Sequence, residues 1–190
     1  MNYAEIKLCD IANGAGVRTT LFVSGCRHHC EGCFNPGTWS FEAGQPYTSK
    51  VEDGLIKSLE PVYVDGLTLL GGEPFEPENQ EALLGLLRRV RSECPGKDVW
   101  AYSGFTWEQI TSGPSRARTP EAQLMLQLID VLVDGPFVLA QKDITLRFRG
   151  SANQRIIDVS RSLAAHEVIL WEDDPLFTSH TWVDRGAGKE

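Results

Sequence analysis

The chain has 190 residues, of which 42% are hydrophobic and 23% are charged, so it is long enough for one domain with a substantial core and too short for two ordinary ones. Its formal net charge of −8 argues against a protein that grips nucleic acid broadly through the phosphates. Its apolar runs are too short to span a bilayer, and its N-terminus lacks the basic segment and apolar core of a signal peptide. We therefore expect a single cytoplasmic domain over residues 1–190, loosely ordered after about residue 175, with no nucleic-acid or membrane partner.

Short β-rich runs alternate with amphipathic helical patterns along the chain. In chain order, the sequence predicts a strand over 18–25, a helix over 49–60, a strand over 66–72, a helix over 78–93, a strand over 98–104, a short helix from Thr106, a helix over 119–128 and a strand over 130–135. Three further β-like runs follow, over 144–150, 154–159 and 166–171. Helix starts are indicated by two capping boxes, Ser49 with Glu52 and Thr106 with Gln109, and by the pair Thr119–Pro120.

Strands and helices that alternate at this spacing predict an α/β fold with parallel strands joined by right-handed crossovers. Such sheets place their ligand sites at the C-terminal ends of the strands. Two motifs fall at such ends, a cysteine-rich loop after the first predicted strand and the pair Gly71–Gly72 after the second. We therefore expect the two motifs to lie at the same edge of the sheet.

The first motif is a cluster of cysteines in the run SGCRHHCEGCFN. Cys26, Cys30 and Cys33 have the spacing C-x₃-C-x₂-C, whereas Cys9 and Cys94 have no partner at ligand spacing and are expected to be ordinary thiols. In a reducing compartment, three clustered cysteines more often bind metal than form disulfides. The three clustered thiols are therefore candidate metal ligands.

Three thiols are one short of the usual four ligands. A structural zinc would need a fourth ligand, which His28 or His29 could supply. A 4Fe–4S cluster takes one cysteine per iron, so three thiolates would leave one iron open to an outside ligand.

The second motif is LLGGEPF, which follows a strand of the buried type. Gly71 and Gly72 lack the Cβ atoms that would keep a ligand away from the backbone, and Glu73 adds an acceptor for a cationic amine, although the same residues could form an ordinary turn. Asp134, at the end of a later predicted strand, could accept from a ribose hydroxyl or an amine, or could simply mark a turn. Weaker candidates for ligand contacts are Arg18, Asn153 and Arg155.

The two motifs together resemble the radical S-adenosylmethionine superfamily, in which C-x₃-C-x₂-C at one strand exit precedes Gly–Gly–Glu–Pro at the next. Within that superfamily, longer segments resemble the proteins that activate anaerobic ribonucleoside-triphosphate reductases. These segments, which span roughly residues 10–160, are NGAGVRTTLFVSGC, GCFNPGTW, GLTLLGGEPF, WAYSGFTWE, DVLVDGPF and RGSANQRIIDV. One departure is Gly32, which stands where the superfamily usually has an aromatic residue before the third cysteine, while Phe34 follows that cysteine instead.

The resemblance implies an abbreviated, open (β/α) partial barrel of the radical S-adenosylmethionine type. It implies a 4Fe–4S cluster with one open iron, held by Cys26, Cys30 and Cys33, and no catalytic residue beyond these ligands. It also implies that S-adenosylmethionine is bound by residues of the two motifs and by one strand end, namely Gly32, Cys33, Phe34, Gly71, Gly72, Glu73 and Asp134.

The implied reaction is the one-electron cleavage of S-adenosylmethionine to methionine and a 5′-deoxyadenosyl radical. That radical would abstract hydrogen from a glycine on the large subunit of the reductase, with a small protein such as a flavodoxin as the electron donor. Alternatives are an activator of another glycyl-radical enzyme, such as pyruvate formate-lyase, a radical enzyme that acts on a pterin, and a metal-binding module without turnover.

Overall fold

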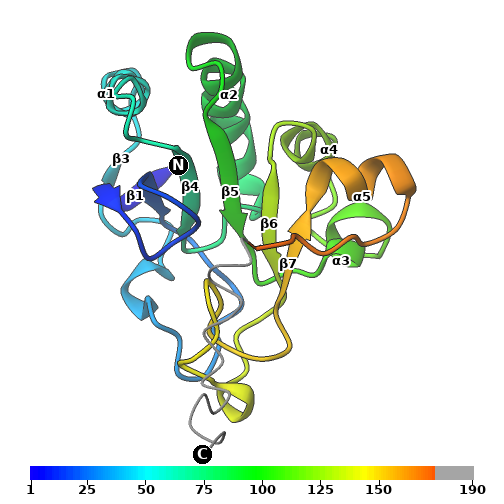
Figure 1. The fold of residues 1–190 in the computed structure, drawn as a ribbon. Coiled ribbons are helices and arrows are strands. Elements are labelled where there is room, and N and C mark those ends of the chain that lie inside the picture. Colours follow the sequence, from blue (N-terminus) through cyan, green and yellow to red (C-terminus); the bar gives the residue numbers. More distant parts are fainter. Residues whose placement is uncertain (174–190) are drawn as a thin grey trace, which may run out of the picture.

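The computed structural model describes residues 1–173 and shows a mixed α/β fold on one open, seven-stranded sheet (Figure 1). The strand order across the sheet is β3-β1-β2-β4-β5-β6-β7. The strands are β1 (Asn2–Asp10), β2 (Arg18–Val23), β3 (Gln45–Pro46), β4 (Gly66–Gly71), β5 (Asp98–Tyr102), β6 (Val131–Asp134) and β7 (Arg155–Asp158). The tail after about residue 175, which we expected to be loosely ordered, lies outside the described residues. Among the described helices, none is both long enough and apolar enough to cross a membrane.

The four central strands confirm the predicted parallel core. β2 pairs with β4, β4 with β5 and β5 with β6, all in parallel. Every residue of β2 and β6 is buried, as expected for parallel strands that are covered on both faces. The helices between them are α1 (Ser49–Leu59), α2 (Pro77–Glu93), α3 (Trp107–Thr111) and α4 (Pro120–Leu126).

The two edges of the sheet differ from the prediction because their strands are antiparallel. β1 and β3, neither of which was predicted, extend the sheet beyond β2, and β7 pairs with β6 in the opposite direction. The sheet is therefore mixed, with a parallel centre and antiparallel margins.

Two of the last β-like runs were predicted wrongly. Residues 144–150 form a loop, because the Asp143 carboxylate accepts from both the backbone N–H and the hydroxyl of Thr145, at 2.8 and 2.7 Å, and Phe148 has a φ of 58°. Residues 166–171 follow helix α5 (Val159–Ala165) and form a turn and a single isolated bridge, from Leu170 to Ile157, in place of the predicted strand.

Two of the three predicted helix caps are confirmed. Thr106 and Gln109 form the expected capping box at α3, and Thr119 caps α4 by accepting from Ala122 N at 3.0 Å. The Ser49 and Glu52 box was wrong, because the cap of α1 lies one residue earlier, at Thr48.

The two faces of the sheet are covered differently. Alternate residues such as Leu21, Leu69 and Ala101 pack into the main core, together with the apolar sides of α1, α2 and α4. The residues between them face the other side, where Trp100 meets Phe148 and Trp171 edge to face at 5.2 and 5.0 Å. Loops rather than helices cover this second face, which leaves room for a cavity.

Arg18 closes the end of that second face that lies farthest from the cysteine loop. Its side chain is fully buried, and it donates to Thr68 Oγ1 at 2.6 Å and to the carbonyl of Leu67 at 2.9 Å. It also pairs with Asp98 at 2.5 Å and lies over the Trp100 ring. One guanidinium therefore joins β2, β4 and β5 at the ends of the strands opposite the cysteine loop.

We predict that Arg18→Met lowers the free energy of unfolding by about 2–5 kcal/mol, because it removes the donor that satisfies the buried acceptors Thr68 Oγ1 and Leu67 O. Denaturant unfolding under oxygen-free conditions measures the change. The matched control is Arg161→Met, whose partner Glu172 lies 3.7 Å away on the exposed surface, and which should change stability by less than about 0.5 kcal/mol. Equal effects of the two substitutions would contradict the role given to Arg18.

Candidate cluster and cofactor site

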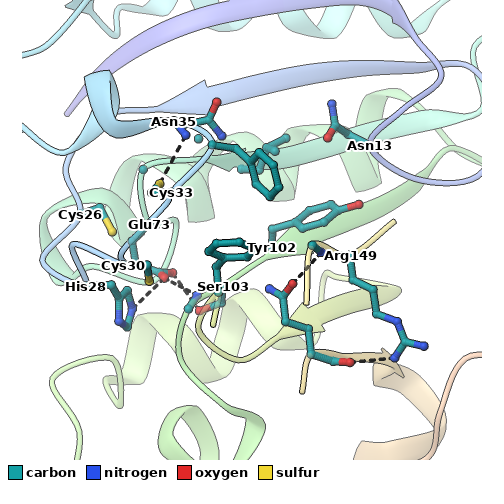
Figure 2. Close-up of a pocket in the computed structure, with 18 of the residues that line it drawn as sticks. Asn13, Cys26, His28, Cys30, Cys33, Asn35, Glu73, Tyr102, Ser103 and Arg149 are labelled. Carbon is teal, nitrogen blue, oxygen red and sulfur yellow. Dashed lines mark hydrogen bonds and ion pairs between the residues drawn. The ribbon is translucent and has the colours of Figure 1, made fainter. Parts of the chain in front are cut away.

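A cavity of about 440 Å³ opens at the C-terminal ends of the parallel strands (Figure 2). The segment after β2 and the segment after β6 lie at the same lower end of the sheet in Figure 1. Residues of both predicted motifs, which follow β2 and β4, line this one cavity, as the strand pattern indicated. Its lining includes all three clustered cysteines, the glycine pair, the end of β5 and the loop before β7, namely Cys26, Cys30, Cys33, Gly71, Gly72, Glu73, Tyr102, Ser103, Arg149 and Gly150.

The cysteine loop is held at both ends by backbone hydrogen bonds. Gly25 N donates to Thr38 O at 2.8 Å, and Cys26 N donates to Trp39 O at 3.0 Å. At the other end, Cys33 N donates to Cys30 O at 3.1 Å, and Asn35 N donates to the Cys33 sulfur at 3.3 Å. The spacing of the cysteines thus folds into a compact loop that places the thiols against the cavity.

Burial changes the acidity of two of these thiols. Cys26 is buried, and this burial raises the pKa of its thiol to about 11. Burial also raises the pKa of the half-buried Cys30. Without a metal these groups stay protonated, so a bound metal centre must displace their protons.

The positions of the two histidines bear on the zinc alternative, in which one of them would supply a fourth ligand. The two candidate histidines are engaged elsewhere, His28 beside Glu73 at 3.1 Å and His29 stacked on Trp39 at 4.6 Å. Neither histidine is free to complete a zinc site, and the three thiols line one shared cavity, as a cluster with one cysteine per iron would need.

The glycine pair packs directly against the cysteine loop. Gly72 N donates to Val23 O at 2.8 Å, and Glu73 N donates to Gly25 O at 2.9 Å. A Cβ atom at Gly72 would lie 2.6 Å from the Gly25 carbonyl oxygen, and Gly71 has a φ of 107°. The glycines are therefore required by the approach of a neighbouring backbone as well as by any ligand.

Glu73 has a different environment from the one expected of an acceptor for an amine. Its carboxylate is buried, with Oε1 accepting from Phe75 N at 2.8 Å and from Ser103 Oγ at 2.9 Å. Oε2 accepts from Gly104 N at 2.7 Å and faces His28 (Figure 2). Both oxygens are thus satisfied by the protein itself, and its predicted contact with a cofactor amine stays a prediction.

The other predicted cofactor contacts differ in whether they line the cavity. Phe34 lines the cavity and packs against Phe137 with ring centroids 5.1 Å apart. Gly32 has a φ of 73° and lies beside the 137–139 segment. Asp134 is outside the cavity lining, because its buried carboxylate accepts from Trp107 N at 2.7 Å and pairs with Arg155 at 2.5 Å. Its contact with a ribose or an amine also stays a prediction.

The three weaker candidates make contacts within the fold and do not line the cavity. Arg18 is buried at the opposite ends of the strands, Arg155 bridges Asp134 and Glu108, and the Asn153 side-chain amide donates to Pro136 O at 2.8 Å.

Sequence reasoning did not predict that Tyr102 and Arg149 line the cavity. The Tyr102 hydroxyl and Arg149 Nε are buried without a hydrogen-bond partner in the described residues. Burial also raises the pKa of the Tyr102 hydroxyl. The signal for these residues was present only as the segments WAYSGFTWE and RGSANQRIIDV, which carried the family resemblance without an assigned role.

Comparison with known proteins assigns both motifs to one family. A family model described as a 4Fe-4S single cluster domain matches residues 12–157. The anaerobic ribonucleoside-triphosphate reductase-activating protein of Vibrio cholerae is 45% identical over 82% of this chain and 97% of its own length. The proteins of the same name from Escherichia coli K12 and from phage T4 are 43% and 40% identical, over 81% and 82% of this chain and 96% and 93% of their own lengths.

We predict that replacing Cys26, Cys30 or Cys33 by Ala removes most of the bound iron and sulfide, because the cluster loses one of only three protein ligands. Iron and sulfide analysis after anaerobic reconstitution gives the result. Cys9→Ala and Cys94→Ala are the controls and should load normally, since Cys9 is exposed and Cys94 is packed in the core. Loss of the cluster in Cys94→Ala would instead indicate a fully ligated electron-transfer centre.

We predict that Gly72→Ala weakens both cluster loading and S-adenosylmethionine binding, because the new Cβ pushes on the carbonyl of Gly25, the residue before Cys26. Overpacking of this kind destabilises by about 1–3 kcal/mol. Iron analysis and anaerobic titration calorimetry measure the two effects. The control is Gly85→Ala in α2, where a Cβ meets nothing within 4 Å, and it should leave both quantities unchanged. Normal loading with weaker binding in Gly72→Ala would show that the glycine serves the ligand alone.

Proposed function

The chain belongs to the family of anaerobic ribonucleoside-triphosphate reductase-activating proteins, and we propose that it activates such a reductase by generating a glycyl radical on its large subunit. The observation that carries the proposal is that three clustered thiols and a Gly–Gly–Glu segment line one cavity. When bound, a reduced 4Fe–4S cluster and S-adenosylmethionine supply a 5′-deoxyadenosyl radical that takes a hydrogen atom from a glycine of the reductase.

The protein's own residues hold and shield this chemistry. Cys26, Cys30 and Cys33 would each hold one iron of the cluster, and the iron without a protein ligand would be open to S-adenosylmethionine. The backbone of Gly71 and Gly72 lines the cavity at the end of β4, where it would contact the ligand. No acid–base pair is needed, so the remaining side chains orient the ligand and exclude water.

Adenine is expected beside the third cysteine. Gly32 and Cys33 offer backbone groups there, and the ring of Phe34 lines the cavity next to them. This arrangement places an aromatic surface after the cysteine, where the superfamily usually has one before it.

The open sheet suits a macromolecular substrate. We take the fold to be an abbreviated partial barrel of the radical S-adenosylmethionine type, formed by a single domain. Support comes from the four parallel strands, the cavity at their C-terminal ends and the separation of β3 and β7 at opposite edges of the sheet. A glycine within another protein can reach a cavity that the sheet does not enclose. The electron donor is expected to be a small redox protein such as a flavodoxin.

We predict that the reconstituted protein, S-adenosylmethionine, a reductant and the reductase together produce a glycyl radical under anaerobic conditions, detected by electron paramagnetic resonance. Cys30→Ala should abolish the signal. Pyruvate formate-lyase, offered in place of the reductase, should remain unmodified. A radical on that enzyme alone would support the alternative activator, and a colourless zinc protein would support the module without turnover.

A further inference from the structure

His28 connects the cysteine loop to the ends of two strands. It lies midway between Cys26 and Cys30 in the sequence, and its Nε2 atom is 3.1 Å from Glu73 Oε2, a close polar contact that lacks hydrogen-bond geometry. Its ring meets Phe105 edge to face, with centroids 4.4 Å apart. The ring also occupies the space beside Gly104, where a Cβ would lie 2.6 Å from His28 Cδ2. The loop, the end of β4 and the turn after β5 therefore meet at this one side chain (Figure 2).

Glu73, the residue that faces His28, has a carboxylate side chain that is only 1% exposed. Its three hydrogen bonds come from Phe75 N, Ser103 Oγ and Gly104 N, which belong to the segments after β4 and β5. His28 is the contact that this carboxylate makes with the cysteine loop. Because three protein donors already fix this carboxylate, the histidine ring lies against a side chain whose position is set by the segments after β4 and β5.

A second carboxylate of the same segment repeats the arrangement. Glu76 is fully buried and accepts from the backbone N–H of Arg27 at 3.0 Å and from its guanidinium at 2.8 Å. The middle of the cysteine loop is thus tied to residues 73–76 through side chains, whereas its ends are tied through backbone bonds.

We propose that His28 is a positioning residue that, through Glu73, keeps the cysteine loop in register with the Gly71–Gly72 pair. The inference rests on the proposed function in one respect, that the two motifs share one cofactor. His28 binds no iron in this arrangement. Its contribution is to fix how far the thiol-bearing loop stands from the glycine pair, so that one molecule can contact both.

The experiment compares two substitutions that separate the polar contact from ring packing. His28→Phe keeps an aromatic ring against Phe105 but has no polar atom to face Glu73, and His28→Gln restores a polar group of similar reach. His29→Asn is the matched control, because His29 is in the same loop, stacks on Trp39 instead and has a φ of 48° that Asn tolerates.

All variants are expected to load iron and sulfide as the parent does. His28→Phe should bind S-adenosylmethionine about tenfold more weakly by anaerobic titration calorimetry, the change in an equilibrium constant expected when one polar contact is lost. It should also reduce the change that S-adenosylmethionine produces in the electron paramagnetic resonance spectrum of the reduced cluster. His28→Gln should retain most of both, and His29→Asn all of both.

Three results would overturn the proposal. Parent-like binding by His28→Phe would show that the polar contact does not matter. An equal loss in His28→Gln would assign the effect to the ring, and loss of iron in His28→Phe would make the histidine a determinant of cluster binding itself.

Failure of the proposed function has a different signature. If the parent itself did not respond to S-adenosylmethionine, the proposed function would fail, and the positioning role would be read from hydrogen exchange without ligand. The Gly104 amide, which donates to Glu73 Oε2 at 2.7 Å, should then exchange faster in His28→Phe than in the parent or in His29→Asn. Unchanged exchange at that amide would reject the role of His28.

Discussion

The buried carboxylate of Glu73 fixes three segments of the site at once. It accepts hydrogen bonds from the segments after β4 and β5, and it faces His28 on the cysteine loop. Removing a charge from water is unfavourable unless nearby groups replace the lost hydration, so these donors cannot move independently of the carboxylate. The Gly–Gly–Glu segment therefore contributes to the site through an interior brace, while its backbone remains the part that a ligand can approach.

A second constraint, the packing of one backbone segment on another, links ligand binding to local structure at the glycine pair. From sequence, Gly71 and Gly72 could serve either the close approach of a ligand or an ordinary turn. The structure gives a further reason, since the carbonyl of Gly25 occupies the space where a side chain at Gly72 would lie. The residue before the first cysteine thus packs on the segment that faces the cavity. A change on one side is transmitted to the other through backbone contact.

Local patterns predicted the centre of the fold, and contacts between distant residues decided the rest. Strands β2, β4, β5 and β6 were predictable because buried parallel strands are continuous apolar runs. The edge strand β1 is mostly exposed and β3 has only two residues, so neither carried such a signal. The cysteines and glycines were found from spacing and resemblance. The contact of His28 with Glu73 joins residues 45 positions apart, and no local pattern could predict it.

The sheet divides the enclosure of the site between the protein and its proposed substrate. At the end of the loop-covered face that lies away from the cysteine loop, Arg18 packs on Trp100 and Trp100 packs on Phe148, which closes that end of the cavity. At the other end, Phe34 remains 62% exposed at the cavity and Ile144 is 89% exposed on the loop before β7. A reactive radical needs water excluded, yet a glycine of another protein needs a way in. Under the proposed function, an open sheet that is closed at one end meets both needs, because a docked reductase would supply the missing wall of the cavity.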